Sequence, residues 1–408
     1  MQTNSGAIFS KKKYLISKRK RSAYANTICT SLAYRSKICD QENIPSELHG
    51  NENRKIKTTL TTLCCAVLAC TAFSSANAAT IGVSMPTQSL QRWNQDGHNL
   101  EAQLEAAGHK VELLYAGDND IPTQVSQIEN MISGDVDVLV VAPIDGGALT
   151  TALQGAIDKG IPVISYDRLI MNSKAISYYA TFDNYKVGQI QGNYIVDALK
   201  LKDDATTPKN IELFTGSIDD NNVNFFFGGA MDILKPYLDS GKLVCKSGQT
   251  KKEQVATLNW STEEAQKRME NLISSVGYGP DGVKLDVVLS SNDSVANGVT
   301  NALTASGYNA DNFPLLTGQD CDKPSVKNMK RGLQTMSVFK DTRVLADQVV
   351  KMVNAIVDNK EVPVNDTKTY NNGTGVIPSY LCSPIVVTKD NLKEVLIDSG
   401  YYTEKEVK

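Results

Sequence analysis

The chain has 408 residues, 21% of them charged, and a formal net charge of −3 at pH 7. This length accommodates two domains of ordinary size. The basic residues gather at the N-terminus, where residues 1–78 hold 12 Lys and Arg against 4 Asp and Glu. The remainder has 30 basic and 41 acidic residues and a net charge near −11. Such a surface repels phosphate backbones, which argues against nucleic acid as a partner.

The first 78 residues have the pattern of an export signal. Residues 1–53 are polar and basic without a sustained apolar period, and we interpret them as a non-native or disordered extension, most simply explained by a start codon assigned too far upstream. In residues 54–78, basic side chains precede the apolar run Leu60–Phe73, which is too short to span a membrane. Ala76-Asn77-Ala78 matches an Ala-x-Ala cleavage site, so we predict a periplasmic protein cleaved after Ala78. Lipoprotein processing at Cys70 is an alternative, although Leu fits the middle of that motif poorly.

Cysteine is sparse in the predicted mature chain. Only Cys245, Cys321 and Cys382 follow the cleavage site. An odd count in an exported protein allows at most one disulfide plus a free thiol. The favoured interpretation is three small buried hydrophobic side chains, because free Cys is commonly buried.

From Thr80 onward, strands and helices alternate along the chain. The first series is predicted to contain strands at 80–85, 111–115, 136–142, 162–166 and 176–180 and helices at 93–107, 121–132 and 148–159. The second series is predicted to contain helices at 185–199, 222–237, 262–275 and 294–305 and strands at 211–215, 243–246, 285–290 and 314–317. Helix 325–331, strand 335–339, helix 342–358 and a strand-rich tail with an exposed, charged end at 402–408 follow.

This alternation predicts an α/β protein made of right-handed βαβ units and parallel sheets. Two series of similar size indicate two lobes, each with a doubly wound sheet. The pattern after residue 320 has too few elements for a third lobe, so we expect the chain to cross back. The predicted N-terminal lobe is 80–182 plus about 320–372, and the C-terminal lobe is 184–318 plus about 376–408.

Five apolar runs after residue 160 end directly in polar residues. These ends are Asp167-Arg168, Asp220-Asn221-Asn222, Asn292-Asp293, Gln319-Asp320 and Lys340. In open α/β sheets, ligands bind beyond the carboxyl ends of the strands, so we expect these side chains to converge on one cleft. Carboxylates, carboxamides, one Arg and one Lys suit an uncharged polyol, whose hydroxyls both donate and accept hydrogen bonds.

Two motifs that would indicate a cofactor or a metal fail in context. Gly277–Gly282 matches G-x-G-x-x-G but ends a predicted helix and precedes a strand, the reverse of a dinucleotide-binding turn. Asp118-Asn119-Asp120 begins like a calcium loop, yet Pro122 and Thr123 occupy positions of a ligand and of the required Gly. We therefore predict no cofactor, no metal and no catalytic residue.

Trp93 and Trp260 admit two interpretations. In the first, each indole is part of the core, and the three Asp residues at strand ends are helix caps. Alternatively, sugar rings present apolar C–H faces that pack on indoles, and one indole from each lobe would sandwich a pyranose. The coincidence of Asp167, Asp220 and Asp320, each beside another polar residue, favours a binding site over capping alone.

At these residues the chain resembles the periplasmic aldose-binding proteins of sugar ABC importers, the xylose-binding and multiple-sugar-binding receptor family. The resemblance covers 80–408 and is carried by residues 126–131, 166–170, 178–184, 219–222, 318–320, 339–343 and 364–370. It implies two lobes joined by three hinge segments, near 182–184, 317–319 and 371–378. The hydrogen-bonding residues that it implies are Arg92, Asp167, Arg168, Asp220, Asn222, Asn292, Asp320 and Lys340, with Trp260 and Trp93 stacking on the sugar. Cys321, beside Asp320, departs from the family pattern without an explanation.

The resemblance implies binding rather than chemistry. The expected ligand is an aldopentose or aldohexose such as xylose, arabinose, glucose or galactose, and the expected partner is the membrane permease of an ABC importer, with a chemoreceptor or sensor kinase as a further candidate. A sugar-responsive repressor domain is a rival, but the export signal and the absence of a helix-turn-helix count against it. A second rival is a secreted carbohydrate enzyme that uses Asp167 with Asp220 or Asp320 as acid and base. Neighbouring cations would hold those carboxylates ionised and so remove the general acid.

Overall fold

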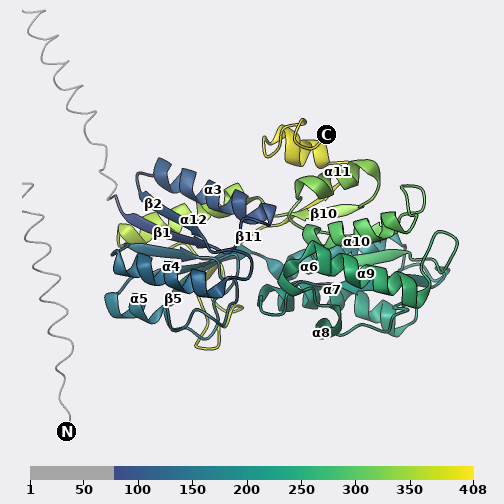
Figure 1. The fold of residues 1–408 in the computed structure, drawn as a ribbon, viewed down its shortest axis with the longest axis horizontal. Coiled ribbons are helices and arrows are strands. Elements are labelled where there is room, and N and C mark those ends of the chain that lie inside the picture. The colour runs from purple at the N-terminus through teal and green to yellow at the C-terminus, as the bar shows by residue number, and fades with distance from the viewer. Residues whose placement is uncertain (1–77) are drawn as a thin grey trace, which may run out of the picture. The chain divides into compact units, whose positions relative to one another are not determined.

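The computed structural model describes residues 78–408, which form two α/β lobes (Figure 1). The first lobe contains a six-stranded sheet in which every neighbouring pair is parallel. In spatial order its strands are β11 (Ser379–Cys382), β5 (Ile176–Phe182), β4 (Val163–Tyr166), β3 (Val138–Val141), β1 (Thr80–Met85) and β2 (Lys110–Tyr115). Every residue of β3 and β4 is buried, as expected for strands covered on both faces.

Helices cover both faces of this sheet. The helices of the first lobe are α3 (Gln91–Ala106), α4 (Ile121–Ser133), α5 (Gln154–Lys159) and α12 (Thr342–Val357). Val138 and Val140 of β3 pack in one core cluster with α3 and α12, while Leu139 and Val141 pack in another with α4 and α5. Figure 1 shows the late helix α12 beside the early helix α3, so the chain returns to this lobe after building the other.

The second lobe is smaller in sheet and richer in helix. Its parallel sheet contains β7 (Leu243–Val244), β6 (Lys209–Phe214), β8 (Val287–Ser290) and β9 (Leu315–Leu316) in that order. A separate antiparallel pair joins β10 (Met336–Phe339) to β12 (Ile385–Thr388), which the prediction of purely parallel sheets did not include. Its helices are α6 (Asn184–Ala198), α7 (Asn222–Asp239), α8 (Lys252–Val255), α9 (Thr262–Val276), α10 (Asp293–Ala305) and α11 (Lys323–Arg331), with a 3₁₀ turn at Leu258–Trp260 and a π-helical turn at Lys393–Asp398.

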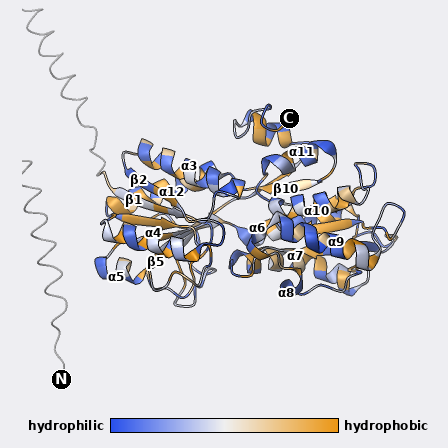
Figure 2. Cartoon of the chain, in the orientation of Figure 1, coloured by the Kyte–Doolittle hydropathy of each residue, from blue (hydrophilic) through white to orange (hydrophobic). Residues whose placement is uncertain are grey.

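A local sequence signal explains where α4 begins. The Asp120 side chain accepts a hydrogen bond from the backbone N–H of Thr123 at 3.1 Å, and Pro122 lies in the first turn of α4. Figure 2 shows hydrophobic strands inside each lobe and helices of mixed hydropathy around them. Within residues 78–408, no helix is both long and apolar enough to cross a membrane.

The chain passes between the lobes at three places, and two of them differ from the predicted hinges. The passage between β5 and α6 lies at 182–184, as expected, and the others lie between β10 and α12 and between β11 and β12. Residues 320–340 therefore lie in the second lobe, because β10 pairs with β12 and Gln319 bridges Val338. Segment 371–378 lies within the first lobe, where the Asn372 amide donates to the backbone oxygen of Ser173 at 2.8 Å.

The C-terminal segment also differs from the prediction of an exposed end. Tyr402 is 3% exposed and Val407 is fully buried, in a core cluster with Cys321 and Phe339. The Tyr402 hydroxyl donates to the backbone oxygen of Cys321 at 3.0 Å. Charged residues surround Tyr402 and Val407 in the sequence, so the local pattern did not indicate that these two side chains are buried.

The three cysteines of the described chain are free thiols. Cys321 and Cys382 are buried and Cys245 is partly buried, in agreement with the favoured interpretation of small hydrophobic side chains. Cys321, the departure from the family pattern, is a buried member of the core cluster that contains Tyr402 and Val407.

Candidate functional site

A pocket between the two lobes brings together all ten predicted site residues. They are Arg92, Trp93, Asp167, Arg168, Asp220, Asn222, Trp260, Asn292, Asp320 and Lys340. Each of them is at least nine-tenths buried.

The first lobe contributes the start of α3 and the end of β4. Arg92 and Trp93 lie in the first turn of α3, and Asp167 and Arg168 directly follow β4. The Arg168 guanidinium carbon lies 5.0 Å from the centre of the Trp93 ring, and Arg168 Nη1 donates a hydrogen bond to the backbone oxygen of Ile144 at 3.0 Å. Trp93 therefore supports Arg168 by a cation–π contact.

The second lobe contributes residues that follow its strands. The Asn292 side chain caps α10, accepting from the backbone N–H of Val295 at 3.0 Å, and Asp220 accepts from the backbone N–H of Asn222 at 2.9 Å. Asn292 is thus the N-cap of α10, whereas Asp220, one of the three Asp residues weighed as helix caps, lies one residue before the N-cap of α7. Asp320 and Lys340 lie at the ends of the segments that precede α11 and α12.

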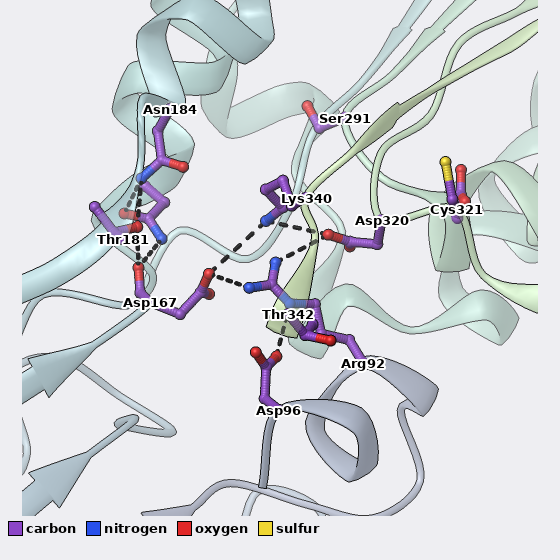
Figure 3. A network of polar contacts seen from close by, with 12 residues as sticks. Arg92, Asp96, Asp167, Thr181, Asn184, Ser291, Asp320, Cys321, Lys340 and Thr342 are labelled. Atoms are coloured by element: carbon purple, nitrogen blue, oxygen red, sulfur yellow. Dashed lines mark hydrogen bonds and ion pairs between the residues drawn. The ribbon is translucent and has the colours of Figure 1, made fainter. Parts of the chain in front are cut away.

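Arg92 is the centre of a buried network of ion pairs that joins the lobes (Figure 3). Its Nη2 lies 2.6 Å from Asp167 Oδ1, its Nη1 lies 2.9 Å from Asp320 Oδ1 and its Nε lies 2.8 Å from Asp96 Oδ2. Lys340 Nζ lies 3.1 Å from Asp320 Oδ1 and 3.8 Å from Asp167 Oδ1. A guanidinium presents a rigid fork of donors, so this arrangement fixes the position of all three carboxylates.

Further polar contacts cross between the lobes beside this network. Arg168 Nε lies 3.0 Å from Asp220 Oδ2. Asn222 donates through Nδ2 to the backbone oxygen of Asp167 at 2.8 Å and accepts from the Tyr179 hydroxyl at 2.9 Å. The lobes are therefore closed on each other in this structure, with donors and acceptors from both sides facing the pocket.

The carboxylates of the pocket differ in their ionisation. Burial opposes the charged form of Asp167, but Arg92, then Lys340 and Arg168, outweigh it and lower the pKa of Asp167. Burial raises the pKa of Asp220 despite the attraction of Arg168. We expected neighbouring cations to hold both carboxylates ionised. The lowered pKa of Asp167 agrees with this expectation, and the raised pKa of Asp220 does not.

Trp260 is held in an unusual backbone conformation against a glycine. Asn259 and Trp260 have φ of 54° and 57°, in the left-handed region that costs free energy for a residue as bulky as Trp. A Cβ on Gly216 would lie 2.1 Å from Cζ2 of the indole, so the ring packs directly on the backbone there. Ser261, the residue after Trp260, is the N-cap of α9. Its side chain accepts a hydrogen bond from the backbone N–H of Glu264 at 3.3 Å.

We expect Gly216→Ala to displace the Trp260 ring, because the added methyl group occupies the space of the indole. Ligand affinity should fall at least tenfold. Gly228→Ala in α7 is the matched control, since a Cβ at Gly228 meets no atom within 4 Å. Calorimetric titration of both variants measures the effect, and equal affinities would contradict this role of Gly216.

Sequence reasoning missed several residues of the site. Leu90, Phe226, Ser294 and Asp322 also line the pocket. Asp96 lies one helical turn after Arg92, and this i, i+4 spacing of opposite charges is a signal that could have identified it. Phe226 belongs to a hydrophobic core cluster of the second lobe, and Lys340 Nζ lies 5.4 Å from the centre of its ring.

Asp322 is a buried carboxyl group that is expected to destabilise the fold at neutral pH. Burial, followed by the charge of Asp320, raises the pKa of Asp322 to about 7. The folded state then holds a proton that the unfolded state has lost above pH 4, so the free energy of unfolding falls between pH 4 and 7.

Asp322→Asn should remove this loss and stabilise the protein at pH 8 by up to a few kcal/mol, with no gain near pH 4, because one pKa unit corresponds to about 1.4 kcal/mol. Urea unfolding at the two pH values measures it. Asp311→Asn, at an exposed site, is the control. A gain of the same size at pH 4 would contradict the titration of Asp322 as its cause.

The comparisons with known proteins agree with this architecture. A family model described as a periplasmic binding protein domain matches residues 81–361. The multiple sugar-binding periplasmic receptor ChvE of Rhizobium radiobacter is 51% identical over 336 residues, which are 82% of this chain and 94% of that protein. The D-xylose-binding periplasmic protein of Escherichia coli is 37% identical over 353 residues, which are 86% of this chain and all of the relative.

A solved structure shares more of the sequence. An ABC transporter solute-binding protein from Clostridium phytofermentans, with bound β-D-glucose, is 61% identical, with a TM-score of 0.78 over 81% of this chain and 100% of that one. A carbohydrate transporter solute-binding protein from Chloroflexus aurantiacus, in complex with D-glucose, is 32% identical, with a TM-score of 0.71 over 80% of this chain and 97% of that one.

Proposed function

This chain belongs to the periplasmic binding protein family, and we propose that its ten cleft residues bind the monosaccharide that it delivers to an ABC importer. The observation that carries the proposal is the convergence of these residues, drawn from both lobes, on one buried pocket. Charged groups make hydrogen bonds roughly twice as strong as neutral ones, so a ring of hydroxyls gains most from such a lining.

The proposed ligand is an aldopyranose. Asp167 and Asp320 would accept from sugar hydroxyls, Arg92, Arg168 and Lys340 would donate to them, and the buried indole of Trp260 would contact the C–H face of the ring. Relatives that are named for several sugars or for D-xylose, and solved relatives with glucose bound, support xylose, arabinose, glucose and galactose as the first ligands to test.

The proposed mechanism is closure around the ligand. Each sugar hydroxyl that bonds groups of both lobes stabilises the closed form over the open one. The three passages between the lobes would serve as the hinge. The closed form is then the species that the permease recognises, and a chemoreceptor or sensor kinase is a second proposed partner of the same form.

Ligand-induced closure predicts two changes that occur together. A ligand bound only by the folded state adds about 2.7 kcal/mol to the free energy of unfolding at a hundredfold excess over Kd. The melting temperature should rise and the radius of gyration from solution scattering should fall at saturating aldose. A rise in melting temperature with an unchanged radius of gyration would contradict closure.

We further propose that the exported chain begins at Ala79, after a signal peptide at 54–78. This segment and residues 1–53 lie almost entirely outside the described residues. Ala79 is 5% exposed, its backbone N–H donates to His109 Nδ1 at 3.3 Å, and β1 starts at the next residue, so the fold begins where the cleavage motif ends. N-terminal sequencing of periplasmic material tests this, and a lipid-modified Cys70 at the terminus would contradict it.

The relatives are sugar-binding transport receptors, and we propose that this protein likewise has no catalytic activity. The enzyme alternative still has a physical basis, because the pKa of Asp220 is raised while that of Asp167 is lowered, a split that acid–base pairs use. Incubating the purified protein with disaccharides and analysing the products decides between the two. Released monosaccharide would favour a hydrolase.

A further inference from the structure

A second cavity lies between the lobes and next to the site described above. It shares Leu90, Trp93, Arg168 and Trp260 with the inner pocket, so the two spaces adjoin at these four side chains. Ser89, Asp118 and Glu263 of its lining are exposed, so this outer cavity opens to solvent. The proposed monosaccharide site uses none of these three residues.

The outer cavity is built from both lobes with similar chemistry. In the first lobe, the Thr87 and Ser89 hydroxyls both donate to Asp118 Oδ1, the bond from Ser89 being 2.5 Å long. In the second lobe, the Ser261 hydroxyl donates to Glu263 Oε2 at 2.8 Å. A hydroxyl and carboxylate group on each wall offers acceptors for the donor hydroxyls of a polyol.

The carboxylates and the indole that line the outer cavity indicate which class of ligand fits it. Hydrogen bonds from Ser89 and Thr87 lower the pKa of Asp118, so this carboxylate stays ionised at neutral pH. Asp219 and Glu263 also line the cavity, and the one cation among the described residues that line it, Arg168, is already paired with Asp220, so the three carboxylates of the lining disfavour an anionic occupant. Trp260, which lines both cavities, is 4% exposed and its indole N–H has no hydrogen-bond partner in the described chain.

We propose that the outer cavity is a subsite for the second ring of a neutral disaccharide whose first ring occupies the inner pocket. The proposal rests on the proposed function, because the inner ring is the monosaccharide of that site. The ion pairs of Arg92 with Asp167 and Asp320 belong to the lining of the inner pocket, and the inner pocket and the outer cavity meet at the four shared side chains. A glycosidic substituent on the inner sugar would extend toward Trp260 and the two walls.

The test compares monosaccharides with their own disaccharides. Protein purified from the periplasm is titrated calorimetrically with D-glucose, cellobiose and maltose, and with D-xylose and xylobiose. We expect at least one disaccharide to bind within about tenfold of its monosaccharide. Binding of a monosaccharide with no binding of any disaccharide would overturn the outer subsite and leave the proposed function standing, whereas no binding of any sugar would overturn both.

A matched pair of variants locates the second ring. Ser89→Trp fills the outer cavity, while Gln88→Trp places the same side chain at the neighbouring exposed position, which does not line it. Ser89→Trp should weaken the disaccharide at least tenfold and leave the monosaccharide unchanged, and Gln88→Trp should change neither. A disaccharide that binds the parent and Ser89→Trp equally would overturn the proposal.

Discussion

Arg92→Ala is expected to lower the free energy of unfolding by about 3–5 kcal/mol at neutral pH, because it leaves buried carboxylates without their shared cation. The guanidinium pairs with Asp96, Asp167 and Asp320, and all four side chains are at most 8% exposed. Sugar binding should be lost as well, since Asp167 and Asp320 would no longer hold their positions. Urea unfolding and calorimetric titration measure the two effects.

The pH dependence of the free energy of unfolding is a control for the Arg92→Ala prediction. The folded-state pKa of Asp167 is lowered, so its contribution to stability is present above its ordinary pKa of 3.8 and is lost as the pH falls through the lowered value. The difference between parent and variant should therefore be greatest at neutral pH and shrink in acid. Arg92→Lys, which retains charge without the fork, should fall between the two. A deficit that stays constant from pH 7 to pH 3 would indicate lost packing instead.

Asp320→Ala and Trp260→Ala are expected to weaken sugar binding in different ways. Loss of a charged hydrogen-bonding partner should cost about 1.5–3 kcal/mol, which is about 10-fold to 150-fold in affinity. Asp320 contacts Arg92 and Lys340 at one point of the pocket, so its loss should affect epimers unequally, according to the hydroxyl that each directs toward it. Trp260 should contribute contact area to every pyranose alike.

The affinities of both variants for D-glucose, D-galactose, D-xylose and L-arabinose separate these effects. Trp260→Ala should lower all of them by a similar factor, and Asp320→Ala should change their order. Binding of every aldose by Asp320→Ala with the affinity of the parent would contradict the place of Asp320 in the sugar site.

The convergence of the site's side chains on one pocket was predictable, because parallel strands carry their carboxyl ends to one edge of a sheet. Apolar runs that stop at Asp167, Asp220 and Asp320 mark three such ends, and the structure brings all three carboxylates to one pocket. Asp322 was not identified because no strand ends at it. Its burial depends on the packing of α11, which the local pattern does not specify.

The points at which the chain crosses between the lobes were less predictable than the helices and strands within each lobe. The sequence pattern identifies a strand at 335–339 but not its antiparallel partner Ile385–Thr388, and this pairing decides to which lobe residues 320–340 belong. The raised pKa of Asp220 was missed for a related reason. The sequence indicates a neighbouring Arg, whereas the balance between burial and attraction depends on the final geometry.

Calorimetric titration of the periplasmic protein with D-xylose, L-arabinose, D-glucose and D-galactose tests the central claim most directly. The account predicts saturable one-to-one binding of at least one of these aldoses, lost in a folded Asp167→Ala variant. Saturable binding that is equally strong in Asp167→Ala, or no binding of any aldose by the folded parent, would contradict it.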